Sequence, residues 1–159
     1  MRQGAGWSAV AVLAAVLLAG GALSAVAQDK EAQIKARQDF MKAQGADVKA
    51  IAEYANGKGD KAAAEKAAED LLARSPKVVD HFPAGTSAKE FPGKTAAKPE
   101  IWMEWDKFKT IPAGPLHDEE AKLANTIKTG DAAAVKAQIG ALGKNGCNAC
   151  HDTYRLKQS

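Results

Sequence analysis

Between residues 30 and 55, apolar residues recur every seven positions, which is the spacing of a helix with one buried face. Charged residues occupy the positions between them. The stripe consists of Ile34, Met41, Val48 and Ala55. The stretch from Asn56 to Gly59 ends this helix, because asparagine and glycine favour the conformation that follows a helix C-terminus. The pattern therefore predicts a first helix over residues 30–55.

A second helix is predicted from Asp60, which is a good N-cap residue, to about Asp80. Its inward face begins with alanines and becomes larger toward Leu71, so the first two helices can approach closely. Pro76 should kink or restart this helix, because proline lacks the backbone N–H that a helix needs. Residues 81–99 then form a long loop, and a loop of that length usually has a function or a ligand to lie against.

Pro99 suits the first turn of a third helix. The segment Ile111–Pro115 contains two prolines and should interrupt it, with the helix resuming at about His117 and ending near Gly130. Asp131 caps a last helix that continues into Cys147. Four helical segments in succession predict an all-α fold, an antiparallel up-down-up-down four-helix bundle.

The N-terminus has the three parts of a secretory signal peptide. Arg2 provides the positive start, an apolar run ends near Ala19, and Ala25-Val26-Ala27 provides a cleavage site. An uncleaved membrane anchor is the alternative, but the run is short and glycines follow it. We expect cleavage of residues 1–27, export to the periplasm, no stable membrane insertion afterwards, and a single domain over residues 28–159.

Net charge argues against a nucleic-acid partner. The chain carries 22 Lys and Arg against 19 Asp and Glu, for a net charge of +3. Arg2 is the one charged residue of the predicted signal peptide, so cleavage leaves about +2. No run of basic residues interleaved with aromatics occurs. The charges therefore describe solvated helix surfaces.

The strongest motif is Cys147-Asn148-Ala149-Cys150-His151, the attachment sequence for a c-type haem. Two thiols three residues apart lie on one face of a helix, where both can add to the vinyl groups of one porphyrin edge. The histidine that follows can offer a neutral imidazole nitrogen to the iron. The chain has two cysteines in total, so none remains for a structural disulfide.

Three other interpretations of the cysteines compete with haem attachment. A thioredoxin-like redox centre places its Cys-x-x-Cys at a helix N-terminus inside a βαβ unit, whereas this chain has almost no strand signal. A zinc site needs about four ligands, and only His81 and His117 could complete it. A disulfide within one helix turn is geometrically awkward and leaves His151 without a role.

Aromatic residues are candidates for the surroundings of a haem. Trp102 and Trp105 lie on one aromatic face of the third helix, and either plain core packing or a wall of the haem pocket explains them. Phe82 and Phe91, in the long loop, allow the same two interpretations. Tyr154 falls one turn after Cys150 on the last helix.

These residues resemble the class II c-type cytochromes, which include cytochrome c prime and its low-spin relatives. The resemblance covers the mature chain and is carried by Arg37-Gln38-Asp39-Phe40-Met41-Lys42, Lys98-Pro99-Glu100-Ile101-Trp102 and Cys147 to Arg155. It implies His151 as proximal axial ligand, Arg37 as a propionate partner and Arg155 as a proximal-side cation. The interruption at Pro112–Pro115 departs from the family pattern.

The resemblance places Met41 on the other face of the iron. In low-spin members a methionine there binds the iron of a plain electron carrier, whereas in cytochrome c prime a bulky apolar group blocks the face and the iron takes gases such as NO and CO. Met41 also lies on the core stripe, where any apolar residue would serve. We expect a non-enzymatic electron carrier with Met41 as sixth ligand; the alternatives are a gas-binding cytochrome and a haem-free thiol–disulfide oxidoreductase. The expected partners are periplasmic redox proteins, and the resemblance implies a homodimer.

Overall fold

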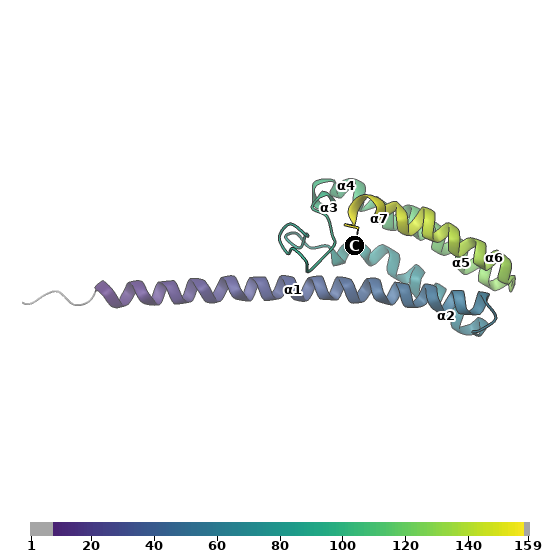
Figure 1. Ribbon diagram of the computed structural model, residues 1–159, viewed down its shortest axis with the longest axis horizontal. Helices are drawn as coiled ribbons and strands as arrows, with labels where there is room; N and C mark the ends of the chain where they lie inside the picture. The colour runs from purple at the N-terminus through teal and green to yellow at the C-terminus, as the bar shows by residue number, and fades with distance from the viewer. Residues whose placement is uncertain (1–7, 158–159) are drawn as a thin grey trace, which may run out of the picture.

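The computed structural model describes the backbone of residues 8–157 and the side chains of residues 27–157. Its principal helices pack side by side as a bundle (Figure 1). Contacts between α1 and α2, α2 and α5, α5 and α6, and α6 and α1 close the ring of four. The principal helices are α1 (Ser8–Ala55), α2 (Lys61–Arg74), α5 (His117–Thr129) and α6 (Ala132–Ala141). The predicted four-helix bundle is confirmed.

The bundle core follows the predicted inward faces. Alanines on the first turns of α2 let that helix approach α1, and larger aliphatic residues fill the space further along. This core cluster comprises Ile51, Ala55, Ala64, Ala67, Ala68, Leu71, Leu123, Ile127, Val135 and Leu142, all of them buried.

The first helix is longer than the apolar stripe predicts, because α1 begins at Ser8 instead of near residue 30. Its N-terminal half extends beyond the other helices (Figure 1). It ends at Ala55, and Gly57 then adopts a φ of +73°, which explains the glycine in this stop sequence. The side chains of the predicted signal peptide up to Val26 lie outside the described residues. Over the described part of the chain, no helix combines the length and apolarity needed to cross a membrane.

Pro76 restarts the second helix as predicted. The Asp60 carboxylate caps α2 by accepting a 2.8 Å hydrogen bond from the Ala63 N–H. The α-helix ends at Arg74, and the chain continues as a 3-10 helix, η1 (Ser75–His81), with the proline in its first turn. A loop over residues 82–98 follows.

The third helix differs from the prediction. It begins as two short turns, α3 (Glu100–Met103) and α4 (Trp105–Phe108), separated at Glu104, which has φ −112° and ψ 35°. The proline segment is not a gap, because Pro112–Leu116 forms a π-helical turn, η2, that leads directly into α5. The wider turn accommodates Pro115, whose ring would clash with the preceding turn of a regular α-helix.

The last helix carries the cysteine motif, as predicted. Asp131 caps α6 by accepting hydrogen bonds from the N–H groups of Ala133 and Ala134, at 2.9 and 3.0 Å. A π-helical segment, η3 (Leu142–Cys147), then joins α6 to α7 (Asn148–Tyr154) without a break. The bundle therefore holds the motif at the end of a continuous helical run.

Candidate haem site

Tight packing fixes the start of the cysteine motif. Gly146 is buried, and a side-chain carbon on it would lie 3.0 Å from a methyl carbon of Leu142 and 3.2 Å from one of Leu116. η3 therefore lies close against η2, and only glycine fits between Asn145 and Cys147 without a rearrangement. The two cysteines that follow are both half-buried free thiols.

The two thiols face different apolar clusters. Cys147 packs against the bundle core, whereas Cys150 packs against a second, mainly aromatic cluster at the end of the bundle. This aromatic cluster comprises Ala97, Ile101, Phe108 and Tyr154, with Val79, Phe82, Trp102, Trp105 and Ile111 packed around them. The motif thus lies where the two clusters meet, which suits the edge of a large apolar cofactor.

Both thiols are held in the protonated form. Desolvation raises the pKa of Cys150 to about 11. Desolvation and then the negative charge of Glu120 raise the pKa of Cys147. Thiol–disulfide exchange requires a thiolate, so these surroundings are the opposite of those of a redox-active Cys-x-x-Cys. They argue against the oxidoreductase interpretation.

His151 is the remaining member of the donor set, and its side chain is exposed. Partial desolvation and then the positive charge of Arg155 lower its pKa, which favours the neutral imidazole that binds iron. Among the described residues, no group of three or more His, Cys, Asp or Glu side chains could hold a metal ion. His81 stacks on Phe40 at 4.0 Å, and His117 binds Ser75, so neither completes a zinc site. Two free thiols and one neutral imidazole fit a c-type haem.

Arg37 anchors the long loop to α1. Its guanidinium donates to the Thr86 hydroxyl (2.9 Å), the Thr86 carbonyl (2.8 Å), the Thr95 hydroxyl (3.0 Å) and the His81 carbonyl (3.3 Å). It also lies 4.9 Å from the centroid of the Phe82 ring. The side chain is buried, and desolvation lowers its pKa to about 10. Its predicted role toward a haem propionate stays a prediction.

The same loop binds the end of the motif helix. Ala97 and Arg155 form an isolated antiparallel bridge, and the Lys98 N–H donates a 2.9 Å hydrogen bond to the Tyr154 carbonyl. Tyr154 is buried in the aromatic cluster, whereas Arg155 is exposed and ends α7. Loop 82–98 therefore connects α1 with the residues that follow His151.

The tryptophans belong to the aromatic cluster, as the helical spacing predicts. Trp102 and Trp105 are both half-buried, and the Trp102 indole donates a 3.0 Å hydrogen bond to the Phe82 carbonyl. Phe82 packs edge-on against Phe108 with 4.9 Å between ring centroids. Phe91 is half-buried but is not a member of either apolar cluster.

Met41 has an intermediate position on α1. Ile34, one heptad earlier, is buried, and Val48, one heptad later, packs against the bundle core. Met41 shares their face but stays half-buried outside both apolar clusters. Its sulfur accepts a 3.4 Å hydrogen bond from Gln44 on the same helix. The side chain is therefore apolar, inward-facing and not locked into the core.

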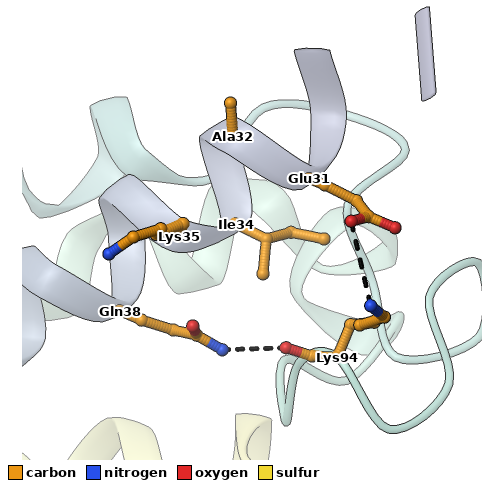
Figure 2. Close-up of a pocket in the computed structure, with 6 residues that line it drawn as sticks. All are labelled: Glu31, Ala32, Ile34, Lys35, Gln38 and Lys94. Atoms are coloured by element: carbon orange, nitrogen blue, oxygen red, sulfur yellow. Dashed lines mark hydrogen bonds and ion pairs between the residues drawn. The ribbon is translucent and has the colours of Figure 1, made fainter. Parts of the chain in front are cut away.

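A separate shallow pocket of about 450 Å³ lies between α1 and the long loop. Figure 2 shows Gln38 donating to the Lys94 carbonyl, at 2.8 Å, and Glu31 pairing with the Lys94 ammonium at 3.8 Å. Half of its lining residues are charged, namely Glu31, Lys35 and Lys94. It contains none of the predicted haem residues and is distinct from the cysteine motif.

The comparisons with known proteins agree with this geometry. The family model for cytochrome c′ matches residues 32–155. A cytochrome c-556 from Agrobacterium fabrum is 37% identical over 87% of this chain and 90% of its own. Among solved structures, a cytochrome c′ from Rhodobacter sphaeroides (TM-score 0.70, 30% identical) covers 81% of this chain and 98% of its own. Oxidised R. palustris cytochrome c556 (TM-score 0.68, 27% identical) covers 80% of this chain and 98% of its own.

A bundle with a Cys-x-x-Cys-His motif at its C-terminal end defines a class II c-type cytochrome. This chain belongs to the cytochrome c′ family. Proteins of this family contain one covalently attached haem c and carry electrons or bind gas ligands. The matched region begins at residue 32, after the predicted cleavage site.

Sequence reasoning missed a polar group inside the bundle. Glu120 is 1% exposed, and the nearby Ser75 hydroxyl lies 3.0 Å from Nδ1 of His117. A signal was present in the sequence, because Glu120 lies three residues before Leu123 and seven before Ile127, on the buried stripe of α5.

Proposed function

We propose that this protein is an exported cytochrome that carries single electrons through one haem c. Cys147 and Cys150 hold the haem as thioethers, His151 binds the iron on one side, and Met41 binds it on the other. The observation that carries the proposal is the position of the two protonated thiols where the two apolar clusters meet, followed directly by His151, whose lowered pKa favours the neutral imidazole.

Each residue has a physical role in this arrangement. Thioether formation consumes an S–H, whose sulfur and hydrogen add across a vinyl group, so thiols that stay protonated are suitable reactants. The haem supplies the one-electron couple of its iron. His151 would bind the iron of the haem, and the aromatic cluster around Cys150 would shield the bound haem from water.

Met41 supports electron transfer over gas binding. A thioether ligand raises the reduction potential and occupies the position that a gas needs. Met41 presents this group on the inward face of α1, and its sulfur accepts a hydrogen bond from Gln44 of the same helix. The competing function is a five-coordinate cytochrome in which Met41 only blocks the distal face.

Absorption spectra of the oxidised and reduced holoprotein, with and without CO, test this proposal. We expect a low-spin spectrum with an iron–methionine charge-transfer band and little response to CO. Met41→Ala should convert the iron to high spin and admit CO. Met103→Ala is the matched control, because Met103 is 79% exposed on α3 and should leave the spectrum unchanged.

Two outcomes contradict the proposal in different ways. A high-spin wild-type spectrum that shifts with CO would establish the gas-binding alternative and leave the haem attachment intact. A colourless protein from an export-competent host would exclude the haem itself.

Cleavage after Ala27 and periplasmic location are part of the proposal and are checked by N-terminal sequencing of the same preparation. A homodimer and periplasmic redox partners are also proposed, and sedimentation equilibrium tests the first.

A further inference from the structure

Glu120 is a carboxylic acid inside the bundle without a hydrogen-bond partner. Its side chain is 1% exposed, and neither carboxylate oxygen makes a hydrogen bond among the described residues. The helix directs it inward, because the fully buried Leu123 and Ile127 lie on the same face of α5. An ionised carboxylate in such a place is unfavourable, and desolvation raises its pKa to about 7.

The elements packed against α5 supply no compensating cation within the described chain. The polar groups that interact with Glu120 are Ser75 of η1 and Cys147 of η3, whereas η2 has no titratable residue. On α5 itself, Glu119 pairs with Lys122 at 2.8 Å. Every charged residue of α2, α6 and η3 is either paired with another residue or exposed. The pairs are Lys61 with Glu65, Lys66 with Asp70 and Arg74 with Asp47. The exposed residues are Glu69, Lys136 and Lys144.

Ser75 connects Glu120 to the surface. Its hydroxyl donates weakly to the Leu72 carbonyl, at 3.3 Å, and lies 3.0 Å from Nδ1 of His117. A hydroxyl can accept one hydrogen bond while it donates another. When the Ser75 O–H rotates toward an ionised Glu120, the Ser75 oxygen can still accept a hydrogen bond from a protonated Nδ1 of His117. The nearby Ser75 hydroxyl lowers the pKa of Glu120, although by less than burial raises it. His117 is only half-buried, so its side chain reaches solvent.

Glu120 is also electrostatically coupled to the cysteine motif. Its negative charge contributes to the raised pKa of Cys147, so the carboxylate lies within electrostatic reach of the sulfur that would bind the haem. Reduction of ferric to ferrous iron removes one positive charge from that neighbourhood. An ionised carboxylate there becomes less favourable, and its affinity for a proton rises.

We propose that Glu120 is a proton-binding site coupled to the haem: reduction of the iron makes Glu120 take up a proton from solvent through Ser75 and His117. The electron comes from a one-electron donor and goes to the iron. The proton forms an O–H bond on the Glu120 carboxylate, and reoxidation releases it. The proposal rests on haem attachment at Cys147 and Cys150 as proposed above, but not on the identity of the sixth ligand.

Spectroelectrochemical titration of the holoprotein at a series of pH values around neutrality tests the coupling. The midpoint potential of the wild type should fall with rising pH between the pKa of Glu120 in the ferric protein and its pKa in the ferrous protein. Outside that interval the midpoint potential should not depend on pH. A tenfold difference in proton affinity corresponds to about 59 mV for a one-electron couple. Glu120→Gln should remove this pH dependence.

Glu119→Gln is the matched control, because it removes the same charge one residue earlier on α5. The hydrogen bond from Lys122 holds the pKa of Glu119 below its usual range, so this group stays ionised throughout the titration. Its variant should therefore keep the pH dependence of the wild type. Any contribution from the haem propionates is common to all three proteins and cancels in the comparison.

A second measurement needs no variant to fold. The reduced-minus-oxidised infrared spectrum of the wild type at neutral pH should show the gain of a protonated carboxyl band. Equal pH dependence in the wild type and Glu120→Gln, or no gain of that band, overturns the proposal while the coloured protein preserves the haem assignment. A colourless protein overturns both.

Discussion

The Tyr154 hydroxyl donates a 2.8 Å hydrogen bond to the Glu104 carboxylate, and this bond joins the end of the motif helix to the break between α3 and α4. The Tyr154 ring packs edge-on against Phe108, with 5.4 Å between centroids. The Tyr154 carbonyl accepts from the Lys98 N–H of the long loop. One buried residue therefore fixes the position of α7 through its ring, its hydroxyl and its backbone.

Tyr154 should ionise only at strongly alkaline pH. Desolvation and then the bond to Glu104 raise its pKa from 10.0 to about 12. Because the pKa of Tyr154 is higher in the folded state than in the unfolded state, its protonated hydroxyl stabilises the fold. This contribution is complete below about pH 10 and is lost as pH rises through about 10 to 12. Ultraviolet titration of the wild type should show one tyrosinate appearing near pH 12 that is absent in Tyr154→Phe. The wild type should also lose its thermal stability advantage over the variant across that interval; parallel melting curves would contradict this.

Arg37 should determine the order of loop 82–98. Arg37→Lys keeps the positive charge but cannot make four directed hydrogen bonds to Thr86, Thr95 and His81. We expect a loss of about 3 kcal/mol in the free energy of unfolding, because buried partners are left unsatisfied. Urea denaturation measures this loss, and hydrogen exchange should become faster in the loop.

Gln38→Ala provides the control for the loop. Gln38 lies next to Arg37 and donates one exposed hydrogen bond to the Lys94 carbonyl of the same loop. Its loss should cost less than about 1 kcal/mol. Equal effects of the two substitutions would show that the loop does not depend on the buried guanidinium.

Local features of the fold were predictable from the sequence. The caps at Asp60 and Asp131 depend on hydrogen bonds to residues two or three positions away, and the structure shows both. The heptad stripe of α1 likewise needs no knowledge of distant residues. The spacing of Cys147, Cys150 and His151 is local too, and for that reason it identified the candidate haem site.

Contacts between distant residues were not predictable in this way. Tyr154 and Glu104 are 50 positions apart, and Arg37 and Thr86 are 49 apart, so no local pattern connects them. The break at Glu104 has no proline or glycine to announce it. Its carboxylate is held by Tyr154, and tertiary structure overrides the helical preference of the sequence there.

The cap of α6 should contribute measurably to the stability of the motif helix. Asp131→Ala removes the acceptor for the N–H groups of Ala133 and Ala134. We expect the free energy of unfolding to fall by about 1 kcal/mol, the usual cost of losing an aspartate N-cap. Asp131→Asn should retain most of the stability, because asparagine also caps. Chemical denaturation of both variants checks this, and equal losses would exclude capping as the cause.

Glu120 should make the stability of the protein depend on pH. Its folded pKa is raised from 4.5 to about 7, so its stabilising contribution is complete below about pH 4.5 and is lost as pH rises through about 7. At about 1.36 kcal/mol for each unit between the two pKa values, the loss amounts to about 3 kcal/mol. Glu120→Gln does not ionise, so urea denaturation should show it gaining stability relative to the wild type by about that amount between acidic and mildly alkaline pH. Glu119→Gln should show no such gain, because the pKa of Glu119 is lowered and its carboxylate is ionised across this interval. A constant stability difference between Glu120→Gln and the wild type would mean that Glu120 reaches water when it ionises.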